Sequence, residues 1–489
     1  MNTGHPKGLY VCFASEMFER LCYYGMRGLL TLYLTKALMM GDTKAFGIYG
    51  AYTALVYAAP VWGGKLADSV LGYRRAIMFG GVVMAIGEFM ILGGNEFWLF
   101  AGMSAIIIGN GYFKANISTV VGRLYKDGDP RRDSGFTIFY MGINIGALLA
   151  TLVVSPIGET QGFHLGFAIA GVGMLAAVGI FMGGAKLLEG HGEPQDMERY
   201  RKWAMPVYGI SLLAIPGIYL LIKYGTEIRI VGQDLLFWIL VGLLAFVCFT
   251  LLKEGFKAGA VQRDRILALL ILMVFNVVFW ACFEQAGSSL TLFADRNVDR
   301  DILGIFTMPA SQTQFFNPAF IILFGSIFSV MWVKLDAIKK NPSIPMKFGL
   351  GIIQLGLGYL LLLVGAAMAG DQALVPLFIL AFMYLLHTTG ELFLSPIGLS
   401  MVTKLAPKHM TGTVMGAWFL SWAFSNYLAS VLAKFTGGGE GVDVATLAPA
   451  ESLATYVDVF GNMGWVTVGI GVLLIALSRP LNRMMHGVT

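Results

Sequence analysis

Long apolar segments, separated by short polar loops, recur along the whole chain of 489 residues. Fourteen of them are long enough to cross a bilayer, because about 20 apolar residues in a helix span its hydrocarbon core. They cover residues 9–38, 46–67, 74–94, 97–122, 134–156, 163–186, 203–223, 233–252, 265–292, 310–335, 345–367, 374–402, 411–434 and 455–478. The pattern predicts an all-α integral membrane protein with 14 transmembrane helices, grouped as six, two and six.

The composition supports this class and excludes others. Hydrophobic residues make up 57% of the chain and charged residues only 13%, whereas a soluble domain carries about 25% charged residues. The net charge of +5 needs no nucleic-acid partner, since basic cytoplasmic loops account for it. All four cysteines fall inside apolar segments, where packing is favoured over disulfides or metal binding; they are Cys12, Cys22, Cys248 and Cys282.

A charged connector follows the sixth span and divides the chain. We expect an N-terminal six-helix bundle over 1–188, a cytoplasmic connector with two extra transmembrane helices over 189–262, and a C-terminal six-helix bundle over 263–489. With both termini cytoplasmic, 24 of the 34 lysines and arginines lie at inner loops and ends, seven lie outside and three lie within the membrane. Because basic residues favour the cytoplasmic side, this count predicts that orientation.

The first predicted helix carries unusual charge at residues 16–27. At about 100° per residue, its polar and aromatic side chains share an arc of roughly 140°. They are Glu16, Glu19, Arg20, Tyr23, Tyr24 and Arg27. Charge within a membrane is costly, so these side chains should face protein or a water-filled cavity. A helix start in the headgroup region, with side chains that reach the surface, is the alternative. The uncharged run 28–35 beyond Arg27 favours the functional interpretation.

Three further ionisable residues lie in the middle of apolar spans: Lys114, Glu284 and Glu391. Together with the first helix they leave one carboxylate in excess, which a cavity that takes up a proton can use. Arg27 and Lys114 place positive charge in the N-terminal bundle, and Glu284 and Glu391 place negative charge in the C-terminal one. This distribution suits a zwitterion such as a peptide or amino acid. Glu88 stands alone, and we place it near the outer surface without a role.

Two six-helix bundles with a cytoplasmic connector resemble the major facilitator fold. In that fold the substrate site lies near the membrane midplane between the halves, which rock to give alternating access. Residues 64–75, G-K-L-A-D-S-V-L-G-Y-R-R, resemble the loop motif that follows the second helix of that superfamily. A tight charged turn is the alternative for this segment.

Five further motifs, in the same order along the chain, resemble one family within that fold, the proton-dependent oligopeptide transporters. The motifs are residues 16–27, 109–118, 139–146, 280–285 and 390–396. The resemblance covers almost the whole chain, and the extra helix pair after the sixth helix is typical of bacterial members. Ala115 departs from the family, which commonly has proline after the lysine, so a smaller kink is expected there.

The resemblance implies a role for each matching position. Proton coupling would involve Glu16, Glu19, Arg20 and Glu284, with Lys114 and Glu284 forming a breakable ion pair. The implied substrate-binding residues are Tyr23, Tyr24, Arg27, Tyr57, Lys114, Asn144, Trp280, Asn317, Glu391, Ser395 and Trp418. Of these, Arg27 and Lys114 would hold the peptide carboxylate, and Glu391 with Asn144 and Asn317 the amino terminus. Trp280 and Trp418 would line side-chain pockets.

The expected function is therefore a proton-coupled symporter that imports di- and tripeptides across a bacterial inner membrane. A monomer is expected, with protons as coupling ion and no cofactor or metal. A carrier of nitrate or another small anion needs only the positive charge of Arg27 and Lys114, so the presence of Glu391 argues against it. A proton-coupled drug antiporter would lack Arg27 and Lys114. An enzyme is disfavoured because the spans contain no paired catalytic Asp, Ser–Lys dyad or H-E-x-x-H motif.

Some of these residues have simpler interpretations. Asn144 and Asn317 are of a type that commonly links helices by hydrogen bonds. The tryptophans suit packing as well as a pocket. His387, one turn before Glu391, is expected mainly to pack. Pro318 and Pro396 predict breaks in their helices.

Overall fold

Every predicted span is helical in the computed structural model, which confirms the all-helical fold. The structure describes residues 4–126, 129, 131–406, 411–437 and 444–488. Within this part of the chain, nine helices are long and apolar enough to cross a membrane by length and composition. The spans outside that group include α1 and α5, which carry many of the polar residues expected in the site.

Contacts divide the chain into two units, which are described separately. Unit 1 runs to Met40 and resumes over Ala51–Asp234, and unit 2 comprises Gly41–Gly50 and the chain from Leu235 onward. The boundary falls inside α2 (Asp42–Ala58), so the first turns of this helix belong with unit 2.

Unit 1 is built from eight further α-helices and four short 3₁₀ or π segments. They are α1 (Lys7–Leu32), η1 (Tyr33–Ala37), α3 (Pro60–Leu66), η2 (Ala67–Leu71), α4 (Tyr73–Ile91), α5 (Glu96–Arg123), α6 (Arg132–Leu149), η3 (Ala150–Val154), α7 (Ser155–Gln161), α8 (Phe163–Gly183), η4 (Ala185–Leu188) and α9 (Met197–Tyr224), followed by the antiparallel pair β1 (Arg229–Ile230) and β2 (Gln233–Asp234).

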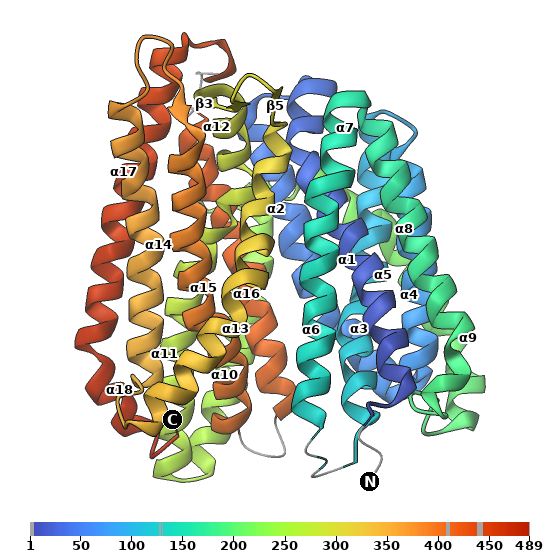
Figure 1. Ribbon diagram of the computed structural model, residues 1–489. Coiled ribbons are helices and arrows are strands. Elements are labelled where there is room, and N and C mark those ends of the chain that lie inside the picture. Colours follow the sequence, from blue (N-terminus) through green and yellow to red (C-terminus); the bar gives the residue numbers. More distant parts are fainter. Residues whose placement is uncertain (1–3, 127–128, 130, 407–410, 438–443, 489) are drawn as a thin grey trace. The chain divides into compact units, whose positions relative to one another are not determined.

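Close backbone contacts hold the helices of unit 1 together (Figure 1). α1 packs against α6 and α8, and α4 packs along α5. A Cβ added at Gly80 would lie 2.4 Å from the carbonyl oxygen of Gly109, and one at Gly87 would lie 2.6 Å from that of Gly102. Small residues are therefore required along the α4–α5 contact, as is common between membrane helices.

Unit 2 contains the remaining elements. They are α10 (Leu235–Lys257), α11 (Ala260–Phe283), η5 (Glu284–Gly287), α12 (Ser289–Asn297), β3 (Val298–Asp299), β4 (Asp301–Ile302), β5 (Phe306–Thr307), η6 (Ala310–Phe315), α13 (Phe316–Ala337), α14 (Ile344–Ala367), β6 (Val375–Pro376), α15 (Leu377–Leu405), α16 (Thr411–Thr436), η8 (Val444–Thr446), α17 (Pro449–Ala476) and α18 (Ser478–Met484). β4 pairs with β5 antiparallel and β3 with β6 parallel, while α14 packs against both α15 and α17 (Figure 1).

Three positions test the predictions made from proline and from span length. The predicted span 265–292 is broken at η5, where a Cβ added at Gly287 would clash with the Tyr49 hydroxyl. The break predicted near Pro318 is confirmed, because 3₁₀ geometry in η6 changes to α-helix just before it. The break predicted at Pro396 is wrong, since α15 continues through this residue; neighbouring groups can compensate for a proline in a membrane helix.

The two extra helices attach to different units. In unit 1, the hydroxyl groups of Tyr112 in α5 and Ser211 in α9 form a hydrogen bond, with their oxygens 2.6 Å apart. In unit 2, Phe237 of α10 packs against Tyr427 of α16 with ring centroids 6.0 Å apart. The boundaries 1–188, 189–262 and 263–489 stay a prediction about functional domains.

The charged connector docks on the loop motif of residues 64–75. The backbone N–H of Arg74 donates to the carbonyl of Gly192 at 2.9 Å, and the Arg74 guanidinium binds Glu193 at 2.7 Å. Gly72 has a φ of 74°, and a Cβ there would lie 2.5 Å from the Pro194 nitrogen. Glycine is therefore needed at this position both for its backbone conformation and for the close approach.

Candidate functional site

The first helix gathers its charges into a buried cluster in unit 1. Arg20 donates from Nε to Glu19 Oε2 at 2.5 Å and from Nη2 to Glu19 Oε1 at 2.6 Å. Its Nε also lies 3.3 Å from Glu16 Oε1, one helical turn away. Asn110 of α5 donates to Glu19 Oε1 at 3.4 Å. All four side chains are buried, and the two-pronged guanidinium contact is the strong form of such a pair.

The same helix face continues with aromatic side chains and a second arginine. The Arg20 guanidinium lies 5.0 Å from the ring centroid of Tyr23 and 6.0 Å from that of Tyr24. The Arg27 guanidinium lies 5.9 Å from the Tyr24 ring. These spacings are within the range of cation–π attraction. The helical periodicity thus brings together the residues predicted from the sequence.

Lys114 of α5 joins this group from a second helix. Its ammonium lies 4.3 Å from the ring centroid of Tyr57, which α2 contributes. The side chain lies within electrostatic reach of Arg20, Glu19, Glu16 and Arg27. α5 runs without interruption from Glu96 to Arg123, although Ala115 follows the lysine. The unit therefore holds two cations, Arg27 and Lys114, beside an arginine-bound carboxylate pair.

A second polar group lies in unit 2. Asn317, at the start of α13, donates from Nδ2 to Glu391 Oε2 of α15 at 2.9 Å and to the Thr388 hydroxyl at 3.1 Å. The Glu391 side chain is 8% exposed. The structure thus joins Asn317 to Glu391, two residues that the resemblance assigned to the same task.

The remaining predicted residues have varied surroundings. Glu284 is buried in η5, where α11 ends. Its predicted pairing with Lys114 would link the two units and stays a prediction. Asn144 is buried and donates to the Tyr140 carbonyl of its own helix at 3.0 Å. Ser395 is half-buried in α15.

The two tryptophans and His387 lie inside unit 2. The indole N–H of Trp280 donates to Asn276 Oδ1 at 3.1 Å, and its ring packs against Trp422 at 5.3 Å. Trp418 is almost fully buried and would contact a Cβ added at Gly398. His387 is buried with its ring 4.7 Å from that of Tyr359. This aromatic environment agrees with the packing role expected for the histidine.

One buried acid was misplaced from the sequence. Glu88 of α4 is 0% exposed, not near the outer surface, and Cys22 of α1 donates its thiol to Glu88 Oε1 at 3.3 Å. The residue lies near the end of its apolar span, which suggested an interfacial position. Its isolation within that span was nevertheless the same signal that identified Glu284 and Glu391.

A second missed feature is the ion pair between Asp42 and Arg296 in unit 2. Arg296 of α12 donates to the two carboxylate oxygens of Asp42 at 2.5 and 2.9 Å, and to the Tyr456 hydroxyl at 3.3 Å. Both residues stood in predicted loops. Among the residues that the structure describes, no group of three His, Cys, Asp or Glu side chains is arranged to hold a metal ion.

Comparison with known proteins agrees with this architecture. The sequence pattern of PTR2, the POT family, matches residues 74–443. An uncharacterized transporter, YclF, of Bacillus subtilis is 36% identical over 99% of this chain and 96% of its own length. Dipeptide and tripeptide permease A of Pectobacterium carotovorum is 34% identical over 99% of this chain and 93% of the permease.

Solved structures agree over the full length. The crystal structure of the peptide transporter POT in complex with sulfate has a TM-score of 0.83 at 34% identity, covering 100% of this chain and 97% of that one. A POT family transporter in complex with 5-aminolevulinic acid has a TM-score of 0.83 at 30% identity, covering 98% of each chain. This chain belongs to the POT family and is a multi-pass membrane transporter of the major facilitator fold, not an enzyme.

Proposed function

We propose that this transporter is a proton-coupled symporter that imports di- and tripeptides by alternating access. The observation that carries the proposal is the buried group of Glu16, Glu19 and Arg20 beside two further cations, Arg27 and Lys114. Such a group offers both a titratable carboxylate pair and positive charge for an anionic substrate group. The names of several relatives, dipeptide and tripeptide permeases, support the same substrate class.

In this proposal the two units bind opposite ends of the substrate. Arg27 and Lys114 hold the peptide carboxylate, with Tyr24 and Tyr57 beside them and Tyr23 next to Arg20 on the same helix face. Glu391, oriented by Asn317, holds the terminal ammonium. A substrate with both charges gains both interactions, whereas a simple anion gains only one. The complex of a similar transporter with 5-aminolevulinic acid, a molecule with an amine and a carboxylate, supports this chemistry.

The proton acts on the arginine-bound carboxylates. When Glu19 binds a proton it loses its negative charge, and the two charge-assisted bonds from Arg20 weaken. The released guanidinium can then take a new partner, which links protonation to a change of conformation. A membrane potential of 100 mV contributes about 2.3 kcal/mol for each proton that crosses inward. Protonation of Glu284 would weaken its proposed ion pair with Lys114 in the same way.

We place the protein in a bacterial inner membrane as a monomer, with both termini cytoplasmic. The distribution of lysine and arginine supports this orientation, because loops rich in these residues stay on the cytoplasmic side. In unit 1 the docked connector, with its ion pairs to Arg74 and Arg75, joins the basic loop motif that the sequence assigns to that side.

Glu19→Gln tests the proposal. In proteoliposomes the wild-type protein should accumulate dialanine, but not free alanine, when an inward pH gradient is imposed. The variant keeps the shape of Glu19 but cannot titrate, so concentrative uptake should fall by roughly tenfold or more, while exchange of labelled for unlabelled dialanine continues in part.

Glu198→Gln, which changes an exposed carboxylate at the start of α9, is the matched control and should behave as wild type. Normal concentrative uptake by Glu19→Gln would overturn the coupling role. Wild-type uptake of nitrate without uptake of dialanine would overturn the substrate assignment.

A further inference from the structure

Glu88 is a buried carboxyl group that the mechanism above does not use. Its side chain is 0% exposed, and the weak thiol donor of Cys22 contacts Oε1 at 3.3 Å. The other oxygen, Oε2, has no hydrogen-bond partner among the described residues. No arginine, lysine or histidine in the described chain lies within ion-pair distance of this carboxyl group.

The neighbours of Glu88 come from four helices. From α1 they are Cys22 and, within electrostatic reach, Glu19. From α2, the buried Tyr52 interacts electrostatically with Glu88, and its hydroxyl has no hydrogen-bond partner among the described residues. Beside Glu88 in the sequence of α4, Gly87 approaches Gly102, Ala105 and Ile106 of α5, and Phe89 approaches Gly171 of α8. The nearby cation of α1, Arg20, is already bound to Glu19.

Burial without a cation makes an ionised carboxylate expensive, and Glu88, unlike the 8% exposed Glu391 with its amide donor Asn317, has only a weak thiol donor to compensate it. We propose that Glu88 holds a proton as a neutral carboxylic acid and exchanges it with the Glu19–Arg20 pair as an additional proton-coupling residue. The exchange role rests on the proposed proton-coupled function, whereas the neutral acid can be tested without transport.

The proposed exchange conserves charge. The O–H bond of Glu88 breaks, an O–H bond forms on Glu19, and the negative charge moves from α1 to α4. Arg20 loses the negative charge of Glu19 in the same step and keeps only its longer contact with Glu16. The Cys22 thiol and Tyr52 hydroxyl are the donors that can stabilise the Glu88 carboxylate. Glu88 would therefore help to decide whether Arg20 stays bound.

Infrared spectroscopy of the full chain in lipid tests the neutral acid. The C=O stretching band of protonated carboxyl groups at neutral pH should lose intensity in Glu88→Gln and shift in Cys22→Ala, which removes the thiol hydrogen bond. Glu96→Gln, in which an ion-paired carboxylate 35% exposed is changed, should leave this band unaltered. An unchanged band in Glu88→Gln would overturn the proposal.

Transport assays test the exchange. Glu88→Gln should retain dialanine counterflow within about twofold but lose roughly tenfold or more of its pH-driven uptake, and the number of protons that enter with each peptide should change. If uptake, its pH profile and the proton count all match wild type, Glu88 is structural and the exchange role is wrong. If the wild-type protein itself shows no pH-driven uptake, the proposed function fails, and the infrared result still decides the protonation of Glu88.

Discussion

Glu19 and Glu391 are both buried carboxylates in membrane helices, but they have different partners. Glu19 accepts two N–H bonds from the Arg20 guanidinium. Glu391 accepts from the uncharged amide of Asn317, and no cation in the described chain forms an ion pair with it. A carboxylate that is oriented by an amide but not neutralised is suited to bind an ammonium group. This contrast supports the proposed roles, proton coupling for Glu19 and substrate recognition for Glu391.

Glu391→Gln should weaken recognition of the peptide amino terminus. The loss of one charge-assisted bond is worth about 1.5–3 kcal/mol, so the KM for dialanine should rise by roughly 10- to 100-fold. N-acetylated dialanine lacks the ammonium, and wild type and variant should transport it equally poorly.

Asp458→Asn, at an exposed position of α17, is the control for the charge change and should leave KM unaltered. A variant that still prefers dialanine over its acetylated form as strongly as wild type would show that Glu391 does not bind the ammonium.

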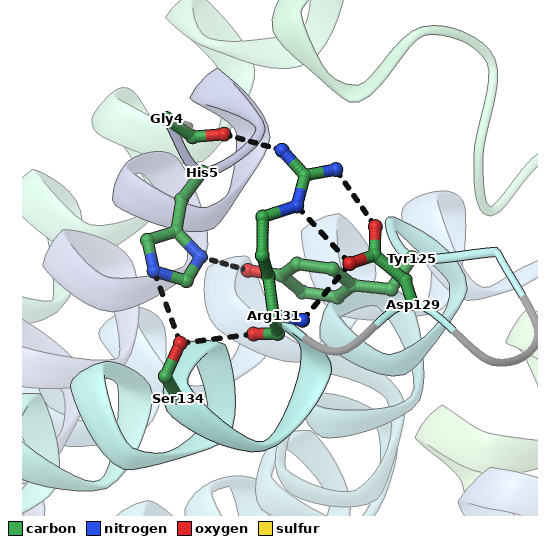
Figure 2. A network of polar contacts seen from close by, with 6 residues as sticks. All are labelled: Gly4, His5, Tyr125, Asp129, Arg131 and Ser134. Atoms are coloured by element: carbon green, nitrogen blue, oxygen red, sulfur yellow. Dashed lines mark hydrogen bonds and ion pairs between the residues drawn. The ribbon is translucent and has the colours of Figure 1, made fainter. Parts of the chain in front are cut away.

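At the scale of elements, the connections between helices carry their own polar networks. Figure 2 shows the N-terminal clasp, formed by Gly4, His5, Tyr125, Asp129, Arg131 and Ser134. The His5 ring contacts the Tyr125 hydroxyl at 2.8 Å and the Ser134 hydroxyl at 3.2 Å. Arg131 donates to the carbonyl of Gly4 at 2.6 Å. The clasp therefore ties the segment before α1 to the α5–α6 connection.

Within the clasp, hydrogen bonds from Arg131 lower the pKa of Asp129 to about 2 from an ordinary value of 3.8. The stabilisation that this carboxylate contributes is complete at a pH above its ordinary pKa of 3.8. It is lost as the pH falls through the lowered pKa of about 2. The Asp129–Arg131 pair thus stays intact under mildly acidic conditions.

Asp129→Asn should loosen this connection at neutral and mildly acidic pH alike. The amide carries no negative charge and has one acceptor oxygen in place of two, so it binds Arg131 more weakly. Trypsin should therefore cleave after Arg131 several-fold faster in the variant, with each rate normalised to a small peptide substrate. Glu198→Gln serves again as the exposed control. Equal cleavage of Asp129→Asn and wild type would contradict a role of the pair in holding the loop.

At the scale of the whole molecule, α2 is notable because the two units share it. Its first residues, through Gly50, group with unit 2, and the rest group with unit 1. The Asp42–Arg296 ion pair, with Tyr456 beside it, fastens the start of α2 to α12 and α17. Asp42 is buried and Arg296 is largely so, and such pairs are costly to break from one side.

Charge-swap variants test whether the Asp42–Arg296 ion pair stabilises the protein. Asp42→Arg and Arg296→Asp should each lower the thermal midpoint of the purified protein by a few degrees, because each leaves an uncompensated charge. The double variant should recover part of the loss, with a coupling energy of roughly 0.5–3 kcal/mol.

The same charge swap at the exposed ion pair Glu254–Lys257 of α10 is the matched control. Its coupling energy should be small, since surface ion pairs contribute about 0–1 kcal/mol to stability. Additive effects of the two substitutions at Asp42 and Arg296 would mean that the pair does not couple.

The membrane class, the helical spans and the charged face of α1 could be predicted from the sequence, because lipid excludes charge and helical periodicity is local. The sequence also identified Lys114, Glu284 and Glu391, each isolated in an apolar run. Only the tertiary structure placed Glu88 beside Cys22, Asn317 on Glu391 and Asp42 on Arg296. These contacts join helices far apart in the chain, and a local sequence pattern does not record which helix faces meet.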